Sequence, residues 1–225
     1  MVKSDKTEDS RSPSPWDPAV ALVLLTRLPL PALPERCFAR QARAAWAFPL
    51  VGLVVALLAG LAGWLAMGLG LPAGIAAGVV LATQIVLTGA MHEDGLADSC
   101  DGLWGGYARE RRLEIMRDSV IGTYGVLGLV ISVGLRWQAL ALLLPVGIGG
   151  LIAAAVLSRG LLPALMTALP PARSDGLSKG VGVPGWDTAG VALILGLGIA
   201  LFAGGAVVLL PALVAGVGGV AVAAL

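Results

Sequence analysis

Long apolar blocks separated by short polar segments make up most of this 225-residue chain. The blocks show neither the alternation of a half-buried strand nor the period of a surface helix, and several approach the ~20 residues that cross a bilayer. Six blocks are long enough: 45–68, 72–91, 119–136, 138–158, 188–204 and 206–225. The pattern predicts an all-α fold, a polytopic transmembrane helix bundle of about six spanning helices within one integral membrane domain over residues 16–225.

The region before the first long block has a different pattern. Residues 1–15 are polar, proline-rich and mixed in charge, without the apolar core of a signal peptide, so we expect a disordered tail. The apolar stretch PAVALVLLTRLPLPALP at 18–34 is too short to span the hydrocarbon layer. Its prolines and Arg27 predict a re-entrant or interfacial segment.

Composition supports a membrane protein and adds little about partners. Hydrophobic residues make up 57% of the chain, charged residues only 13%, and the mean hydropathy is +0.90. We therefore expect membrane lipids around the bundle. A net charge of +1 gives no indication of a nucleic-acid partner, and we expect none. Two cysteines cannot form a disulfide framework. Whether the chain forms a homo-oligomer is left open by the sequence.

Lysine and arginine alternate along the chain in a way that predicts orientation. Basic residues concentrate in 1–43, 92–118 and 159–187, whereas the intervening links carry none or, between the third and fourth blocks, only Arg136. Because basic loops face the cytoplasm, the N-terminus and these three segments are predicted on the cytoplasmic side. The segment 92–118 is the expected active-site segment, and 159–187 is expected to be a second cytoplasmic loop.

Acidic residues cluster in the segment 91–106, MHEDGLADSCDGLWGG, at the end of an apolar block. If this segment is helical, Asp94, Asp98 and Asp101 stand at i, i+4 and i+7 and share one face, with Glu93 beside that face. Carboxylates gathered in this way repel one another unless a cation lies between them.

A second acidic pair follows in ARERRLEIMRDS, where Glu114 and Asp118 are again four residues apart. Two helical segments could point both groups of acids at one site, and oxygen ligands suit Mg²⁺, with Mn²⁺ as an alternative. The predicted metal ligands are Asp94, Asp98, Asp101, Glu114 and Asp118.

Arginines accompany these acids in the same segment, at Arg109, Arg111, Arg112 and Arg117. Guanidinium groups recognise phosphate through paired hydrogen bonds, although any of these side chains could equally face lipid headgroups. Acids for a metal together with arginines for phosphate are typical of phosphoryl transfer.

The stretch HEDGLADSCDG resembles the acidic motif of the cobalamin synthase (adenosylcobinamide-GDP ribazoletransferase) family, and RRLEIMRDSVIGTYG continues the likeness. TRLPLP, AFPLVG, LSRG and ARSDGLSKG also look familial. The resemblance implies a multi-pass, Mg²⁺-dependent enzyme of the bacterial cytoplasmic (inner) membrane with its active site facing the cytoplasm. Such an enzyme joins adenosylcobinamide-GDP to α-ribazole, or to its 5′-phosphate, and releases GMP.

The resemblance also implies roles for individual residues. Asp94 is the first choice for the base that accepts the proton of the attacking hydroxyl, with Glu93 and His92 as alternatives. His92, a lone histidine at a membrane boundary, could instead be structural. The implied substrate-binding set adds Arg159, Arg173, Ser178 and Lys179 to the four arginines of the acidic segment.

Two other functions compete with this reading. Asp98-x-x-Asp101-Gly and Glu114-x-x-x-Asp118 have spacings similar to those of CDP-alcohol phosphotransferases, but the gap between the pairs is shorter and Glu114 replaces an aspartate. A divalent-cation transporter would place acids near the bilayer midplane, and no acid lies inside a predicted span. A ribazoletransferase is therefore the preferred prediction.

Overall fold

The computed structural model describes residues 13–169, 171–172 and 176–205, and these contain helices and connecting turns but no strand. The α-helices are α1 (Asp17–Leu25), α2 (Glu35–Phe38), α3 (Gln41–Ala44), α4 (Phe48–Gly68), α5 (Ala73–Thr88), α6 (Met91–Gly105), α7 (Arg109–Ile115), α8 (Thr123–Leu143), α9 (Gly149–Ala168), α10 (Leu177–Val181) and α11 (Trp186–Gly204). Two 3₁₀ turns, η1 (Ala45–Ala47) and η2 (Leu144–Val146), extend α4 and α8.

Four of the helical segments are long and apolar enough to cross a membrane. They are Gln41–Gly68, Thr123–Val146, Gly149–Ala168 and Trp186–Gly204. The pair α5–α6 is bent by 88° and makes a fifth crossing if it is counted as one broken span. The all-α polytopic fold is thereby confirmed. The predicted span 206–225 and residues 1–12 of the predicted tail lie outside the described residues, and the cytoplasmic N-terminus stays a prediction.

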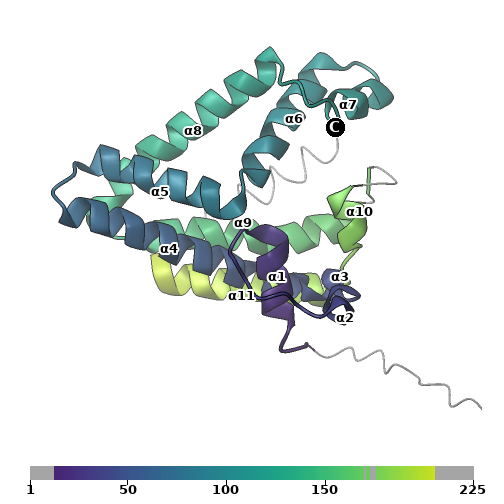
Figure 1. The fold of residues 1–225 in the computed structure, drawn as a ribbon, viewed down its shortest axis with the longest axis horizontal. Helices are drawn as coiled ribbons and strands as arrows, with labels where there is room; N and C mark the ends of the chain where they lie inside the picture. The colour runs from purple at the N-terminus through teal and green to yellow at the C-terminus, as the bar shows by residue number, and fades with distance from the viewer. Residues whose placement is uncertain (1–12, 170, 173–175, 206–225) are drawn as a thin grey trace, which may run out of the picture.

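Helix α9 packs against both α4 and α11, and the three helices lie together in the lower half of the view in Figure 1. Small residues line their contacts. A Cβ on Gly52 of α4 would clash with the backbone of Ala155 in α9, and Gly160 of α9 faces Gly196 of α11. Because lipid tails are as apolar as the helix surfaces, close backbone packing of this kind is what favours association in a membrane.

The boundary between the third and fourth predicted spans was wrong. Helix α8 runs without a break through residues 136–138, and the chain turns only at Leu144–Ile148. Arg136 therefore lies inside a span, where its guanidinium pairs with Glu93 of α6 at 2.6 Å. The actual turn, LPVGI, carries no charged residue. It fits the alternation of basic and uncharged links better than the predicted turn did.

The next boundary also differs from the prediction. Helix α9 continues to Ala168, so Arg159 lies near the middle of that helix and does not open a cytoplasmic loop at 159–187. The polar connection is confined to the residues between α9 and α11, where α10 forms. At the other end of the chain, the stretch 18–34 is helical only to Leu25, the end of the nine-residue helix α1, in keeping with a segment that cannot span.

Candidate active site

The predicted acidic helix exists as α6, and its last turns pack against α8. Asp101 is 9% exposed and points at the start of α8. Its Oδ2 accepts a hydrogen bond from the Gly122 backbone N–H at 2.7 Å, and its Oδ1 accepts one from the Gly125 N–H at 2.8 Å. The carboxylate thus satisfies donors that the first turn of a helix leaves free, and its charge suits the positive end of the helix.

Three glycines spaced three residues apart around the start of α8, Gly122, Gly125 and Gly128, permit this contact. A Cβ at Gly122 or Gly125 would collide with the Asp101 carboxylate, and one at Gly128 would collide with the Cys100 sulfur. The repeat in GTYGVLG is the sequence signal for the close approach of α6 and α8, and the sequence analysis did not use it.

One cavity of about 700 Å³ brings together three of the predicted metal ligands and two of the predicted phosphate ligands. We call it the acidic cavity; it lies between the end of α6, α7 and the start of α8. Its charged lining residues are Asp101, Arg111, Glu114, Arg117 and Asp118. Arg111 and Glu114 form an exposed ion pair at 2.6 Å. Asp118 Oδ1 accepts a weak hydrogen bond from the Val120 N–H at 3.2 Å.

Asp94 and Asp98 stand on the Asp101 face of α6, Asp94 exposed and Asp98 half-buried. Among the described residues, no three histidine, cysteine or acidic side chains already converge on one point where a metal ion could sit. The donor set nevertheless fits Mg²⁺ chemically, because every candidate is a carboxylate. Each Asp101 oxygen keeps a second lone pair beyond its backbone hydrogen bond, so those bonds orient the group without removing it from the donor set.

His92 and Glu93 line a different cavity, of about 490 Å³, which shares no lining residue with the acidic cavity. We call it the arginine pocket, because Arg136 of α8 and Arg159 of α9 enter it. The side chain of Glu93 is 12% exposed, and its Oε1 accepts the hydrogen bond from Arg136. Of the three candidate bases, His92 and Glu93 therefore lie in the arginine pocket, and Asp94 lies outside it.

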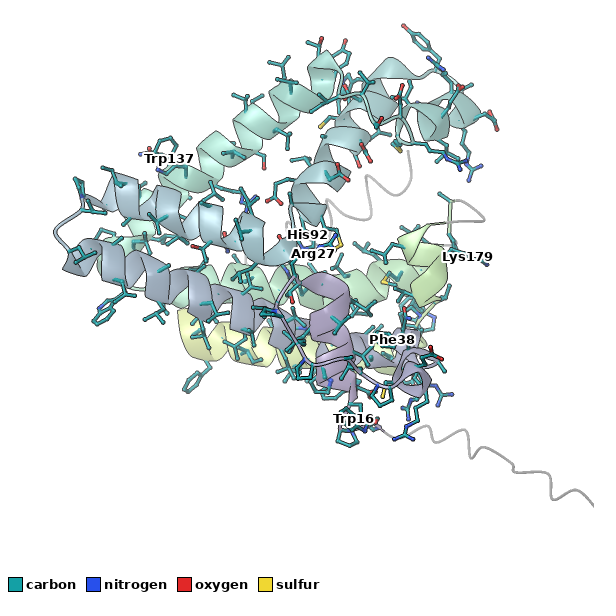
Figure 2. All side chains as sticks on the ribbon, in the orientation of Figure 1. Trp16, Arg27, Phe38, His92, Trp137 and Lys179 are labelled. Carbon is teal, nitrogen blue, oxygen red and sulfur yellow. The ribbon has the colours of Figure 1, made fainter. Side chains whose placement is uncertain are left out.

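The remaining predicted substrate ligands are spread over the surface near α7 and α10. Arg109 Nη2 donates to the Ala172 carbonyl at 3.3 Å, and Arg112 Nε donates to the Gly106 carbonyl at 2.9 Å. Ser178 lines a small groove of about 220 Å³, and Lys179 is exposed on α10 (Figure 2). Arg173 lies outside the described residues.

Sequence comparison places these features in a known family. A sequence model described as cobalamin-5-phosphate synthase matches residues 17–225. The chain belongs to the cobalamin-5-phosphate synthase family. It is 43% identical over 182 residues to the adenosylcobinamide-GDP ribazoletransferase of Bradyrhizobium diazoefficiens, covering 80% of this chain and 70% of that protein. No solved structure matches the chain.

Further relatives carry the same description. The adenosylcobinamide-GDP ribazoletransferase of Mesorhizobium japonicum is 44% identical over 182 residues, with the same 80% and 70% coverage. The one of Sinorhizobium medicae is 42% identical over 196 residues, covering 83% of this chain and 74% of the relative. The predicted family and the predicted enzyme class, a transferase of cobalamin synthesis, are confirmed.

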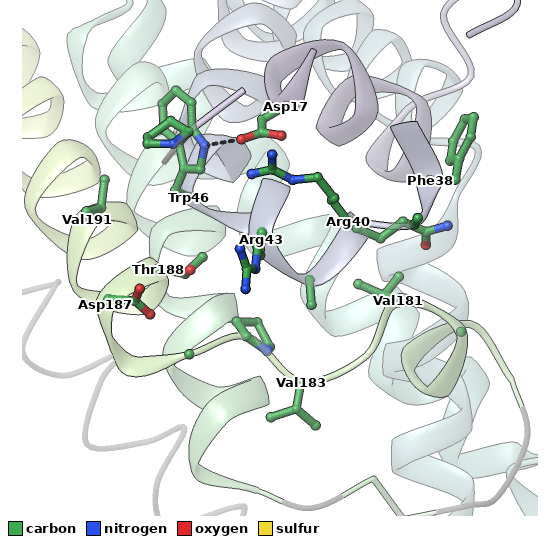
Figure 3. Close-up of a pocket in the computed structure, with 17 residues that line it drawn as sticks. Asp17, Phe38, Arg40, Arg43, Trp46, Val181, Val183, Asp187, Thr188 and Val191 are labelled. Atoms are coloured by element: carbon green, nitrogen blue, oxygen red, sulfur yellow. Dashed lines mark hydrogen bonds between the residues drawn. The ribbon is translucent and has the colours of Figure 1, made fainter. Parts of the chain in front are cut away.

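This family member also has a third cavity, of about 560 Å³, that the sequence analysis missed. Arg40 and Arg43 lie in it together with Asp17, Trp46 and Asp187 (Figure 3). Trp46 Nε1 donates a hydrogen bond to Asp17 Oδ2 at 2.9 Å, which ties the buried start of α1 to η1. From the sequence, these two arginines were used only to predict orientation. The residues near them in the chain give no sign that they lie beside the start of α11 in the fold.

Proposed function

We propose that this chain transfers the adenosylcobinamide phosphate of adenosylcobinamide-GDP to α-ribazole or its 5′-phosphate, with release of GMP, in a Mg²⁺-dependent reaction at the cytoplasmic face of the inner membrane. The observation that carries the proposal is the acidic cavity. Its carboxylates and its two arginines, Arg111 and Arg117, are what a metal-bound diphosphate requires, and they occur in a member of this family.

The proposed metal ligands are Asp94, Asp98, Asp101, Glu114 and Asp118. When bound, Mg²⁺ would offset negative charge on the diphosphate and on the departing GMP. Asp101 is held in place by its hydrogen bonds to the start of α8, so that this ligand is oriented before substrate arrives. Arg111 is close enough to Glu114 to neutralise it until a phosphate competes for the guanidinium.

In the proposed reaction, a ribose hydroxyl oxygen of α-ribazole attacks the phosphorus on the corrinoid side of the diphosphate. A new P–O bond forms, the bond to the GMP oxygen breaks, and GMP leaves with that electron pair. The hydroxyl proton passes to a carboxylate, for which Asp94 is the candidate. Glu93 is less suited, because its Oε1 is held by Arg136. Arg109, Arg112, Arg173, Ser178 and Lys179 are proposed as outer contacts to the guanosine diphosphate.

The test is GMP release by the purified full chain in neutral detergent, supplied with adenosylcobinamide-GDP, α-ribazole and Mg²⁺. We expect GMP with the wild type, none after chelation by EDTA, and restoration by added Mg²⁺. Asp98→Asn should lower turnover by at least about 100-fold, because one ligand of the metal loses its charge.

Glu110→Gln is the matched control, since Glu110 is an exposed acid of α7 that lines none of the three charged cavities. It should release GMP at the wild-type rate. Release of CMP from a CDP-linked donor, with no GMP from the corrinoid donor, would contradict the proposal in favour of a lipid-type phosphotransferase. Uptake of Mg²⁺ into proteoliposomes without any GMP release would favour a transporter.

A further inference from the structure

The arginine pocket is a largely apolar cavity that also holds a few charged and polar side chains. Its lining comes from α5, α6, α8 and α9, and two of these helices, α8 and α9, are candidate spans. Charged side chains on membrane-spanning helices are costly unless they are paired or serve a ligand. The proposed transfer reaction, as described above, gives no role to Arg136 or Arg159.

Positive charge exceeds negative charge in this pocket. Arg136 donates to Glu93 Oε1 at 2.6 Å and, weakly, to Gln84 Oε1 at 3.5 Å. Arg159 donates to the neighbouring Ser158 Oγ at 2.9 Å, but no carboxylate in the described part of the chain forms an ion pair with it. One acid therefore faces two guanidinium groups. A guanidinium in an apolar setting gains most from a charged, oxygen-rich acceptor such as a phosphate.

Two further polar atoms in the pocket lack partners. His92 Nε2 and Glu93 Oε2 are buried and make no hydrogen bond to any described residue. Buried polar atoms are normally satisfied, and leaving one unpaired costs about 1–3 kcal/mol. Both residues line the pocket, so a small rotation of either side chain would let a ligand hydroxyl satisfy these atoms: a hydroxyl donates to Glu93 Oε2 and either donates to or accepts from His92.

Apart from Thr88, the rest of the wall is apolar. Its aliphatic residues are Ala139, Leu140, Leu143, Leu151, Ala154, Ala155 and Leu162. A cavity of about 490 Å³ has the size of a small-molecule site. The occupant that fits this lining has three parts: an apolar ring system, hydroxyl groups and an anionic end.

α-Ribazole 5′-phosphate has these three parts: a benzimidazole base, a ribose and a phosphate. We propose that the arginine pocket is the subsite for this acceptor, with Arg159 and Arg136 on the 5′-phosphate and the leucines against the base. The inference rests on the proposed function. Helix α6 joins the pocket to the acids, because His92 and Asp98 are six residues apart, or about 9 Å along the helix axis. A ribose hydroxyl directed along α6 would thus approach the acidic face.

The first test is equilibrium dialysis of the full chain in lipid-free neutral detergent, with labelled α-ribazole 5′-phosphate and labelled α-ribazole in separate arms. Arg159→Gln should weaken binding of the phosphorylated ligand about 10- to 100-fold more than binding of α-ribazole, the effect of losing a charge-assisted hydrogen bond. Arg159→Lys should recover part of the loss. Arg36→Gln, the same change at an exposed arginine outside the pocket, should bind both ligands as the wild type does.

A second variant tests the apolar wall. Ala154→Phe places a large ring in the pocket and should weaken both ligands to the same extent. Equal weakening of both ligands by Arg159→Gln would overturn the assignment of the phosphate. Unchanged binding of both ligands in Arg159→Gln and Ala154→Phe, with the wild-type elution volume, would overturn the subsite itself.

Added phosphatidylglycerol separates the two sources of a phosphate. If the lipid binds the wild type, loses its affinity in Arg159→Gln, and leaves α-ribazole 5′-phosphate binding unchanged, the pocket holds a lipid headgroup and the inference fails. The binding assay needs no turnover, so binding that follows the expected pattern without GMP release refutes only the proposed function. GMP release with an unaltered preference between the two acceptors in Arg159→Gln refutes only the subsite.

Discussion

Asp101→Asn should lower the temperature at which this protein unfolds, and the size of the loss follows from two hydrogen bonds. The Asp101 carboxylate accepts from the N–H groups of Gly122 and Gly125 at 2.7 and 2.8 Å and is 9% exposed. Asparagine has the same shape but only one acceptor oxygen, so its amide NH₂ would face a backbone N–H. The unsatisfied donor costs about 1–3 kcal/mol, and the lost charge at the helix start costs about 0.3–1 kcal/mol more.

The expected destabilisation is therefore about 1.3–4 kcal/mol, which lowers the Tm of a chain of this length by about 3–16 °C. The assay is thermal unfolding in neutral detergent, read from the size-exclusion peak that survives heating. Asp94→Asn makes the same chemical change at an exposed position of α6 and should shift the Tm by less than about 2 °C. An unchanged Tm for Asp101→Asn, or an equal fall for Asp94→Asn, would refute the capping role.

Three other changes have defined outcomes. Arg136→Leu should lower the free energy of unfolding by about 1–3 kcal/mol, which is less than the loss of a fully buried ion pair would cost, because the Arg136 side chain is 39% exposed. Adding Glu93→Gln to this variant should recover most of the lost stability, and no recovery would contradict the pairing. Gly125→Val should lower the Tm because a Cβ there already collides with the Asp101 carboxylate; Gly134→Val in the same helix, where a Cβ meets no atom within 4 Å, should lower it less. In a chain without its native cysteines, Val146→Cys should react with an impermeant thiol reagent from the periplasmic side; reaction only after permeabilisation would reverse the orientation.

The local sequence was sufficient to predict α6 and its acidic face. Spacing of four and three residues places Asp94, Asp98 and Asp101 on one side of a helix whatever that helix packs against. The spans of α4 and α11 were also predictable, because the apolar blocks there are long and uninterrupted. These features depend on neighbours along the chain.

The errors occur where a partner is distant in sequence. Arg136 interrupts an apolar run and was interpreted as a turn, because nothing near it in the chain could compensate its charge. Its partner, Glu93, is 43 residues away on another helix. Arg159 was placed at the end of a span for the same reason, and its location in the arginine pocket depends on how α5, α6, α8 and α9 surround that pocket.

The bend between α5 and α6 explains how one helix serves two cavities. The chain turns by 88° at Gly89 and Ala90, whose φ values of 63° and 57° are left-handed. The TRLPLP segment supports the turn: the Arg27 N–H donates to the Leu87 carbonyl at 2.7 Å, and the Arg27 side chain lies where a Cβ of residue 89 would be.

If α5 and α6 formed one straight helix, the acids of α6 would continue along the axis of the apolar helix α5. The bend instead directs α6 away from α5, so that the first turn, with His92 and Glu93, remains against the spans while the last turn reaches the start of α8. The periodic spacing of the acids defines a face, but the left-handed turn at Gly89 and Ala90 decides where that face lies. Glycine at position 89 is therefore required twice, for its backbone conformation and for the close approach of Arg27.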